Sequence, residues 1–207
     1  MLLNYLKIAF KVLLRRKFFT AISLFGIGFT LTAILVVTAL ADYALAPLPP
    51  EVNLDRTLHV SWLLKRYSVD GFTREMAGAP GFAFLDRYVR DIPGVEKMSI
   101  VSDASPATRY VEDRTETWNL RTTDGPFWEI LDFGFLEGGP FTDEDERSGN
   151  RVAVINEAAR RAFFGDRPAL NGFIELDGQR YRVVGVVRNV DPLRAEAAAD
   201  VYAPHST

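Results

Sequence analysis

Few residues of this 207-residue sequence have the types and spacing that chemistry requires. His59 and His205 are the only histidines, and their separation does not suggest shared metal ligation. The sequence has no cysteine, which excludes a disulfide framework, a thiolate metal site and a cysteine nucleophile. It also has no phosphate-binding loop of the type Gly-x-x-x-x-Gly-Lys-Ser/Thr. We therefore expect no ATPase site within these residues.

An acidic run at residues 143–146 is the remaining candidate for a cation site. The run lacks the alternating ligands, the glycine and the terminal glutamate of a calcium loop. We interpret it as part of a solvated polar loop over 142–149. Trp118 and Trp128 have the size to line a ligand groove, but aromatic residues in a domain of this size usually belong to the core. The sequence thus predicts a protein that is not an enzyme, with no catalytic residue, cofactor or metal ion.

The distribution of charge divides the sequence into two parts. Residues 1–41 contain five basic residues and no acidic residue, whereas residues 42–207 contain 19 basic and 27 acidic residues, a net charge of −8. The overall net charge of −3 predicts no nucleic-acid partner. From 18 to 41, 24 consecutive residues carry no charge. As a helix they would be about 36 Å long, enough to cross a hydrocarbon core of about 30 Å. This indicates a transmembrane helix over 18–41.

Two other interpretations of the apolar segment are less favoured. A buried helix of a soluble core rarely runs this long without a charge. A cleavable signal peptide is the stronger alternative, because Ala39-Leu40-Ala41 has the small-x-small form of a cleavage site. However, the apolar region of a signal peptide normally has about 7–15 residues. The basic residues before the span, and Asp42 after it, place the N-terminus in the cytoplasm by the positive-inside rule.

The basic residues before the span share one face of a helix. Lys7, Lys11 and Arg15 recur at intervals of four, with leucine and phenylalanine on the other side. Residues 1–17 therefore predict a cytoplasmic, basic amphipathic helix at the inner-leaflet interface. Either this helix only orients and anchors the chain, or its cations face a cytoplasmic partner; the sequence leaves both open.

Beyond the span, the sequence predicts alternating strands and helices. The prolines of residues 46–50 indicate that this segment is stiff and extended. It lies within a linker that we place at 42–56, before a domain at 57–207. A β-α-β unit is expected over 57–101, from a strand at 57–63, a helix at 81–92 and a strand at 95–101.

The last third of the sequence gives the clearest pattern. Residues 151–155 predict a short apolar strand, and Asn156 is a favourable N-cap for a helix that ends at Gly165. Asp177-Gly178 separates two further strands, which is typical of a hairpin with a two-residue turn. The predicted fold class is α+β: an N-terminal transmembrane helix, then a mixed α/β domain with β-α-β units and hairpins.

Three stretches of the sequence resemble the ABC transporter permeases of the MacB/FtsX type. Residues 6–19 resemble the basic helix that leads into the family's first span. The other two stretches resemble its periplasmic core domain, in the expected order. They contain Thr123-Asp124-Gly125-Pro126-Phe127-Trp128, Gly138-Gly139-Pro140-Phe141, Val152-Ala153-Val154-Ile155-Asn156-Glu157 and Val183-Val184-Gly185-Val186-Val187.

This resemblance implies a non-catalytic permease component in the cell inner membrane. The family has four spans, with a large extracytoplasmic domain between the first two. It forms a permease dimer bound to cytoplasmic ABC ATPase subunits. ATP-driven motion of the spans moves the outer domains, which act on cargo or on periplasmic or envelope partners. Lys7, Lys11 and Arg15 are then the candidates for the membrane interface or the side that faces the ATPase.

The given sequence runs to Thr207 without further spans, so the resemblance implies an N-terminal fragment whose domain over 57–207 is incomplete. The alternative function is a single-pass, membrane-anchored periplasmic sensor or scaffold. A binding domain secreted after cleavage at Ala41 is a third possibility.

Overall fold

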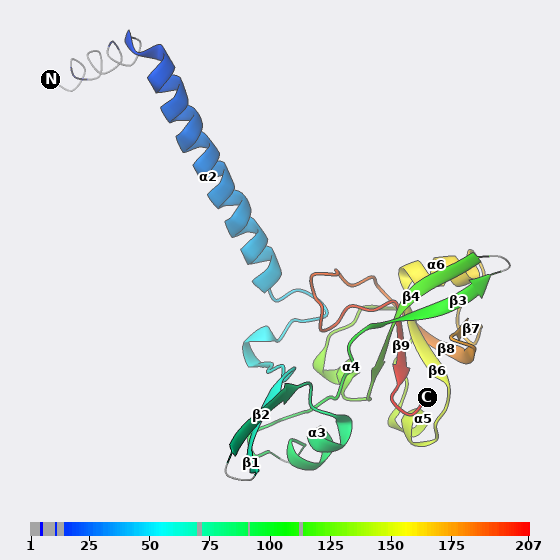
Figure 1. Cartoon of the computed structure of the whole chain (residues 1–207). Helices are drawn as coiled ribbons and strands as arrows, with labels where there is room; N and C mark the ends of the chain where they lie inside the picture. Colours follow the sequence, from blue (N-terminus) through cyan, green and yellow to red (C-terminus); the bar gives the residue numbers. More distant parts are fainter. Residues whose placement is uncertain (1–4, 6–10, 12–14, 70–71, 91, 112–113) are drawn as a thin grey trace. The chain divides into compact units, whose positions relative to one another are not determined.

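The computed structural model describes residues 5, 11, 15–69, 72–90, 92–111 and 114–207. The chain divides into two compact units, Met1–Ala46 and Pro47–Thr207. The first unit is built around one long helix, α2 (Lys17–Leu45), and the second contains all the strands (Figure 1).

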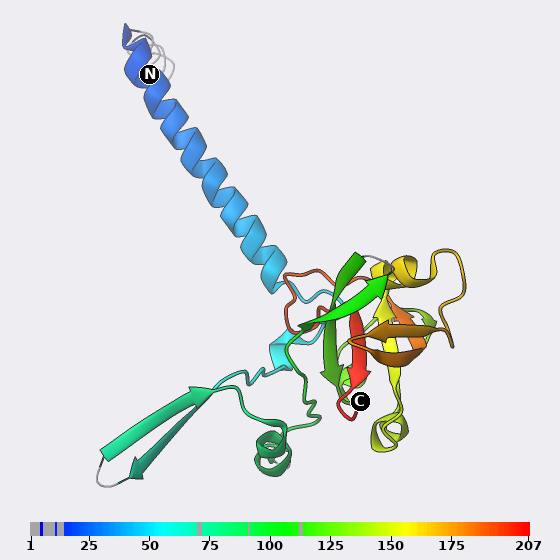
Figure 2. The ribbon, with the colours of Figure 1, turned by 45° about the vertical axis from the view of Figure 1, so that its right-hand side comes forward.

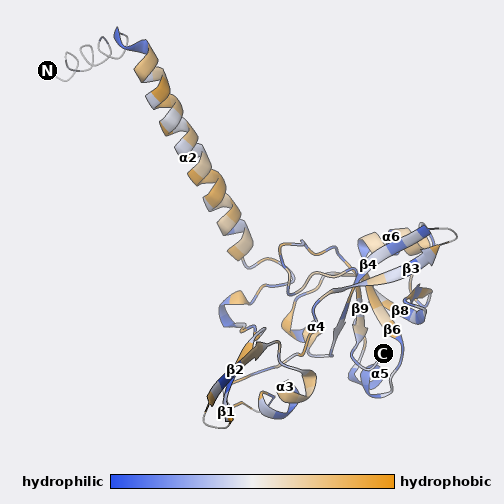
Figure 3. Cartoon of the chain, viewed as in Figure 1, coloured by the Kyte–Doolittle hydropathy of each residue, from blue (hydrophilic) through white to orange (hydrophobic). Residues whose placement is uncertain are grey.

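Helix α2 has the composition and length of a membrane span. Between Lys17 and Asp42 it carries no charge, and none of its 29 residues is buried. In the view of Figure 3, hydrophobic residues follow its length. The hydroxyl groups of Thr30, Thr32 and Thr38 donate to carbonyl oxygens one turn earlier, at 2.8–2.9 Å. Their hydrogen-bonding needs are therefore met inside the helix, as a lipid environment requires. Among the described residues, α2 is the one helix long and apolar enough to cross a membrane.

A mixed seven-stranded sheet forms the centre of the second unit (Figures 1 and 2). The strand order is β3-β4-β9-β6-β8-β5, and β7 also pairs with β8. The pairs β4–β9 and β6–β8 are parallel, and the other pairs are antiparallel. The strands are β3 (Ser105–Val111), β4 (Arg114–Thr123), β5 (Phe135–Gly138), β6 (Val152–Asn156), β7 (Phe173–Leu176), β8 (Gln179–Val187) and β9 (Val201–Pro204).

The predictions for the last third of the chain are confirmed. The Asn156 side chain accepts a hydrogen bond from the Ala159 N–H at 2.7 Å and caps helix α6 (Glu157–Phe164). Gly165 ends this helix with φ at 60°. Helix α6 connects β6 to the β7–β8 hairpin, so that β6 and β8 lie parallel. Asp177 and Gly178 form the hairpin turn, with φ at 49° and 73°.

The sheet separates two hydrophobic clusters. On β6, Ala153 and Ile155 belong to the first cluster, and Val152 and Val154 belong to the second. This alternation follows from the two-residue period of a strand that is covered on both faces. Helix α6 packs on the first cluster, and the short helix α4 (Phe127–Ile130) packs on the second. The partly buried Trp118 packs against the first cluster and Trp128 against the second, so both tryptophans border the core.

The β-α-β unit predicted over 57–101 is wrong. This region contains an antiparallel hairpin, β1 (Leu63–Val69) and β2 (Phe72–Gly78), and the short helix α3 (Phe82–Tyr88) (Figure 2). Residues 95–101 form no strand beyond an isolated bridge at Val101. The N–H of Ile100 donates instead to the Asp124 carboxylate at 3.0 Å. A side chain therefore takes the place of the expected strand partner.

Two smaller expectations also differ from the structure. The acidic run is not a loop but helix α5 (Asp143–Arg147), because Thr142 and Asp145 form a capping box at its start. The segment 46–50, expected to be extended, turns at residues 49 and 50, and the rest of the linker predicted at 42–56 is divided among other elements. Residues 42–45 continue helix α2, a 3₁₀ turn forms at Leu54–Arg56, and Pro50 and Glu51 are buried.

Candidate functional site

The site residues predicted from the sequence lie in the first unit. Lys11 and Arg15 have helical backbone and exposed side chains, whereas Lys7 lies outside the described residues. Their role in facing the membrane or an ATPase therefore stays a prediction.

The two histidines are not brought together. His205 Nε2 lies 2.6 Å from the Ile100 carbonyl oxygen, and its Nδ1 lies 2.9 Å from Thr122 Oγ1. His59 lies 3.9 Å from a Glu196 oxygen. Among the described residues, no cluster of three or more histidine, aspartate and glutamate side chains is placed to hold a metal ion.

A buried ion pair lies near the start of the second unit. Arg194 Nη1 donates to Glu51 Oε2 at 3.1 Å, and their side chains are only 5% and 9% exposed. Beside it, the N–H of Asp132 donates to the Pro50 carbonyl oxygen at 2.8 Å. These four residues, which we call the anchor, tie the segment that follows α2 to two distant loops. A buried ion pair contributes little net free energy to folding. Removing one partner, however, leaves the other charge buried and destabilises the fold.

The loop that carries Arg194 is held by two further buried side chains. Arg121 donates to the carbonyl oxygens of Glu196 and Ala195, both at 2.6 Å. The Tyr202 hydroxyl donates to the Ala197 carbonyl oxygen at 2.8 Å and accepts from the Ala199 N–H at 3.1 Å. Burial lowers the pKa of Arg121 and raises that of Tyr202. Residues 194–199 contain no helix or strand, yet these bonds fix them against the sheet.

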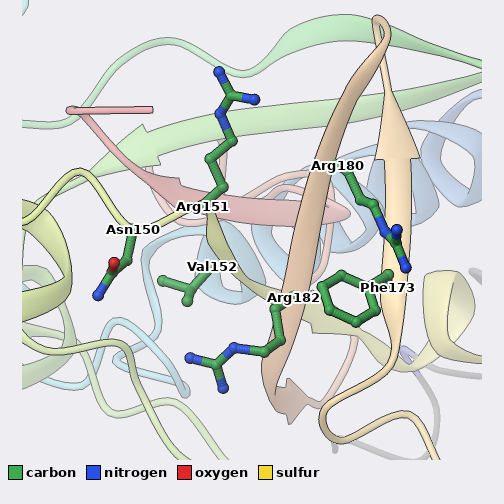
Figure 4. Close-up of a pocket in the computed structure, with 6 residues that line it drawn as sticks. All are labelled: Asn150, Arg151, Val152, Phe173, Arg180 and Arg182. Atoms are coloured by element: carbon green, nitrogen blue, oxygen red, sulfur yellow. The ribbon is translucent and has the colours of Figure 1, made fainter.

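An open hollow of about 370 Å³ is the second candidate site (Figure 4). We call it the arginine hollow; it is lined by Asn150, Arg151, Val152, Phe173, Arg180 and Arg182. Arg180 and Arg182 lie two positions apart on β8 and so project from the same face of the sheet. The Arg180 guanidinium lies 4.0 Å from the centre of the Phe173 ring. Arg182 Nη1 donates to Asn171 Oδ1 at 3.2 Å.

Sequence reasoning missed both sites. Glu51 and Arg194 are 143 residues apart, and no local pattern links them. The arginine hollow did have a signal, because Arg180-x-Arg182 lies in a predicted strand and Arg151 begins another. The excess of acidic residues over residues 42–207 obscured this local concentration of positive charge.

Comparison with known proteins gives a family match over most of the chain. The model of the MacB-like periplasmic core domain matches residues 20–207. The chain is 26% identical over 200 residues to a macrolide export ATP-binding/permease protein MacB of Wolinella succinogenes, covering 91% of this chain and 29% of the relative. It is also 26% identical over 137 residues to the uncharacterized ABC transporter permease YknZ of Bacillus subtilis, covering 63% of this chain and 34% of the relative. The chain thus spans about a third of the length of these relatives.

A partial match to this chain is also found among solved structures. The extracellular domain of the noncanonic ABC-type transporter YknZ from Gram-positive bacteria matches with a TM-score of 0.46 and 24% identity. This match covers 56% of this chain and 57% of that domain.

Proposed function

Because this chain belongs to the MacB-like periplasmic core domain family, we propose that it supplies the first span and the extracytoplasmic domain of an ABC transporter permease. The family and helix α2 together make it a membrane-anchored protein with an extracytoplasmic domain. In this proposal the chain is not itself catalytic. Its domain moves when ATP-driven changes move the span, and it passes that motion to cargo or to an envelope partner.

The anchor is the observation that carries this proposal. Helix α2 ends at Leu45, and Pro50 is already tied to Asp132. Only residues 46–49 separate the two, and proline restricts the backbone at two of these positions. A displacement of the helix therefore reaches the domain through a short, stiff tether that ends in the buried ion pair of Glu51 and Arg194. A flexible linker would absorb the same displacement.

The remaining parts of the proposal concern placement and partners. We place the N-terminus in the cytoplasm, the span in the inner membrane and residues 47–207 in the periplasm. The charge asymmetry across the span supports this orientation. A cytoplasmic ABC ATPase subunit and a second permease copy are the proposed partners. Lys7, Lys11 and Arg15 face the inner leaflet or the ATPase.

Lengthening the tether tests the coupling. A glycine-serine segment is inserted between Ala46 and Pro47 in the permease that contains this chain, produced with its ATPase in its own host. We expect the complex to assemble and hydrolyse ATP, while export falls by about tenfold or more. The control places the same segment between the exposed residues Asp166 and Arg167, where export should be unaffected. Full export with the longer tether would contradict the coupling.

A separate experiment tests the partners. Charge reversal of Lys7, Lys11 and Arg15 together should invert the orientation of the chain or abolish co-purification with the ATPase. Unchanged orientation and co-purification would contradict the role given to these residues. If the unaltered chain never co-purifies with an ABC ATPase, the alternative of a membrane-anchored sensor or scaffold replaces the permease proposal.

A further inference from the structure

The arginine hollow is a local positive site in an acidic part of the chain. Residues 42–207 carry a net charge of −8, yet three arginines line this one hollow. Among the described residues, none of the three forms an ion pair with a carboxylate, whereas Arg109, Arg160 and Arg161 nearby in the fold each have one. Guanidinium groups that form no ion pair with a carboxylate keep capacity for charge-assisted hydrogen bonds to an anion.

The neighbouring carboxylates offset only part of this charge, although the charge of Arg182 acts on Asp145 and helps to lower its pKa. Asp145 accepts hydrogen bonds from the Thr142 N–H at 3.0 Å, the Thr142 hydroxyl at 2.8 Å and Asn150 Nδ2 at 3.1 Å. Its oxygens are therefore already engaged within α5. Glu175 lies opposite Arg180 in the strand register, but it lines a separate hollow of about 240 Å³ that shares Phe173. Three cations therefore face the hollow, against two carboxylates at its margins.

The arrangement of the arginines indicates the shape of the ligand. Their guanidinium groups point in different directions around the hollow rather than toward one point (Figure 4). A single small anion would therefore contact one arginine at a time. An extended chain with several carboxylates can contact all three, and arginine holds carboxylates through two parallel hydrogen bonds.

Two contacts hold these side chains in place before any ligand arrives. Arg180 lies on the Phe173 ring, and Arg182 is bonded to Asn171. This positioning reduces the side-chain entropy that binding would otherwise cost. Phe173 remains 50% exposed and offers apolar surface beside the cations. Arginine and aromatic residues are both enriched in protein interfaces.

We propose that the arginine hollow binds an extended acidic segment of an extracytoplasmic partner protein. Carboxylates of the segment pair with Arg151, Arg180 and Arg182, and an apolar side chain packs on Phe173. This binding goes beyond the coupling proposed above, because it needs neither ATP nor movement of the span.

The test measures binding of a labelled, glutamate-rich peptide that contains one leucine. The full chain is held in neutral detergent micelles, and peptide binding is followed by fluorescence anisotropy at low and at physiological salt. We expect Arg151→Glu, Arg180→Glu and Arg182→Glu together to weaken binding by about tenfold or more. The matched control reverses the exposed Arg74, Arg87 and Arg114, which changes the net charge equally, and should weaken binding less than about twofold. An equal loss in both variants would overturn the proposal.

Three further arms complete the design. Near-ultraviolet circular dichroism checks folding. If the charge-reversed chain does not fold, the corresponding glutamine variants are used. Their loss of peptide binding should be smaller, but it should still be larger for the hollow variant than for the control variant. Displacement of the peptide by inorganic phosphate at equal charge concentration would indicate a small-anion site instead. Displacement by phosphatidylglycerol added to the micelles, dependent on the same three arginines, would indicate a lipid surface. Either displacement overturns the peptide proposal, and resistance to both supports it.

Discussion

Thr108 and Asp177 exchange two hydrogen bonds that link strand β3 to the β7–β8 hairpin. The Thr108 N–H donates to Asp177 Oδ1 at 2.8 Å, and the Asp177 N–H donates to the Thr108 carbonyl oxygen at 2.8 Å. Thr108 lies on the edge strand β3, and Asp177 lies in the turn of the β7–β8 hairpin, whose strand β7 pairs with β8 outside the main strand order. The two bonds join these two elements around the first hydrophobic cluster, to which Ala107 and Leu176 belong.

Replacing Asp177 tests how much this link stabilises the domain. Asp177→Ala removes the acceptor for the Thr108 N–H and places alanine at a positive φ of 49°. We expect a loss of about 1–3 kcal/mol in the free energy of unfolding. Asp177→Asn keeps a carbonyl acceptor and tolerates this φ, so its loss should be about half as large or less. Urea unfolding of the full chain in micelles, followed by tryptophan fluorescence, measures both; equal losses would contradict the hydrogen-bond explanation.

A close approach of two chain segments explains the glycine in the Val-Val-Gly-Val-Val stretch of β8. A Cβ atom on Gly185 would lie 2.2 Å from the Gly139 carbonyl oxygen and 3.0 Å from the Phe135 ring. Gly185→Ala should therefore push β5 away from β8 and cost about 2–4 kcal/mol. Gly139→Ala is the matched control, because a Cβ atom there meets nothing within 4 Å. Urea unfolding compares Gly185→Ala with Gly139→Ala. Similar free energies of unfolding in the two variants would show that β5 can shift freely.

The features that the sequence predicted correctly are local. The Asn156 cap, the Gly165 helix end and the Asp177-Gly178 turn each depend on the conformation of one or two residues. The apolar run of α2 is equally local, because length and composition alone identify it. Such signals act within a few residues and do not depend on the rest of the fold.

The errors arose where distant residues decide the structure. Residues 95–101 are apolar enough for a strand, but Asp124 takes the Ile100 N–H that a strand partner would bond. The Glu51–Arg194 pair and the arginine hollow combine residues from separate loops and strands, which no spacing rule connects. Helix α5 is an intermediate case: its Thr142–Asp145 capping box is present in the sequence, but the density of acidic residues favoured a loop.

The capping box of α5 predicts a pH dependence. Burial alone would raise the pKa of Asp145, but hydrogen bonds from Thr142 and Asn150, together with the charge of Arg182, lower it below its ordinary value. Its stabilising contribution is therefore present above the unfolded-state pKa of about 4 and is lost as the pH falls through the folded-state pKa. Asp145→Asn should cost about 1 kcal/mol at pH 7 and progressively less below pH 4.

The exposed Glu144 provides the control for this prediction. Glu144→Gln makes the same change in charge on the same helix, but Glu144 and its partner Arg147 are 71% and 72% exposed. Its effect should stay below about 0.5 kcal/mol across the pH range. Urea unfolding at several pH values compares the two variants. A difference between wild type and Asp145→Asn that does not shrink at low pH would contradict the assigned role of the carboxylate.

The anchor permits a test that separates stability from specificity. Glu51→Ala leaves the Arg194 guanidinium buried without its carboxylate, which should cost about 3–5 kcal/mol. Replacing both residues by methionine removes both buried charges and keeps their volume, so most of this loss should be recovered. Glu96→Ala is the control, because its ion pair with Arg56 is 73% and 64% exposed and should contribute less than about 1 kcal/mol.

The double variant then shows what the ion pair does beyond folding. If the pair only fills space, the permease with both methionines should export as well as wild type. If the pair instead fixes the direction in which the tether meets the domain, export should fall even though the free energy of unfolding is restored. The reason is that apolar contacts allow the two segments to slide, whereas a directional hydrogen bond at 3.1 Å does not. Unfolding and export measured on the same variants distinguish these outcomes. Restored stability with reduced export is the result expected from the proposed coupling.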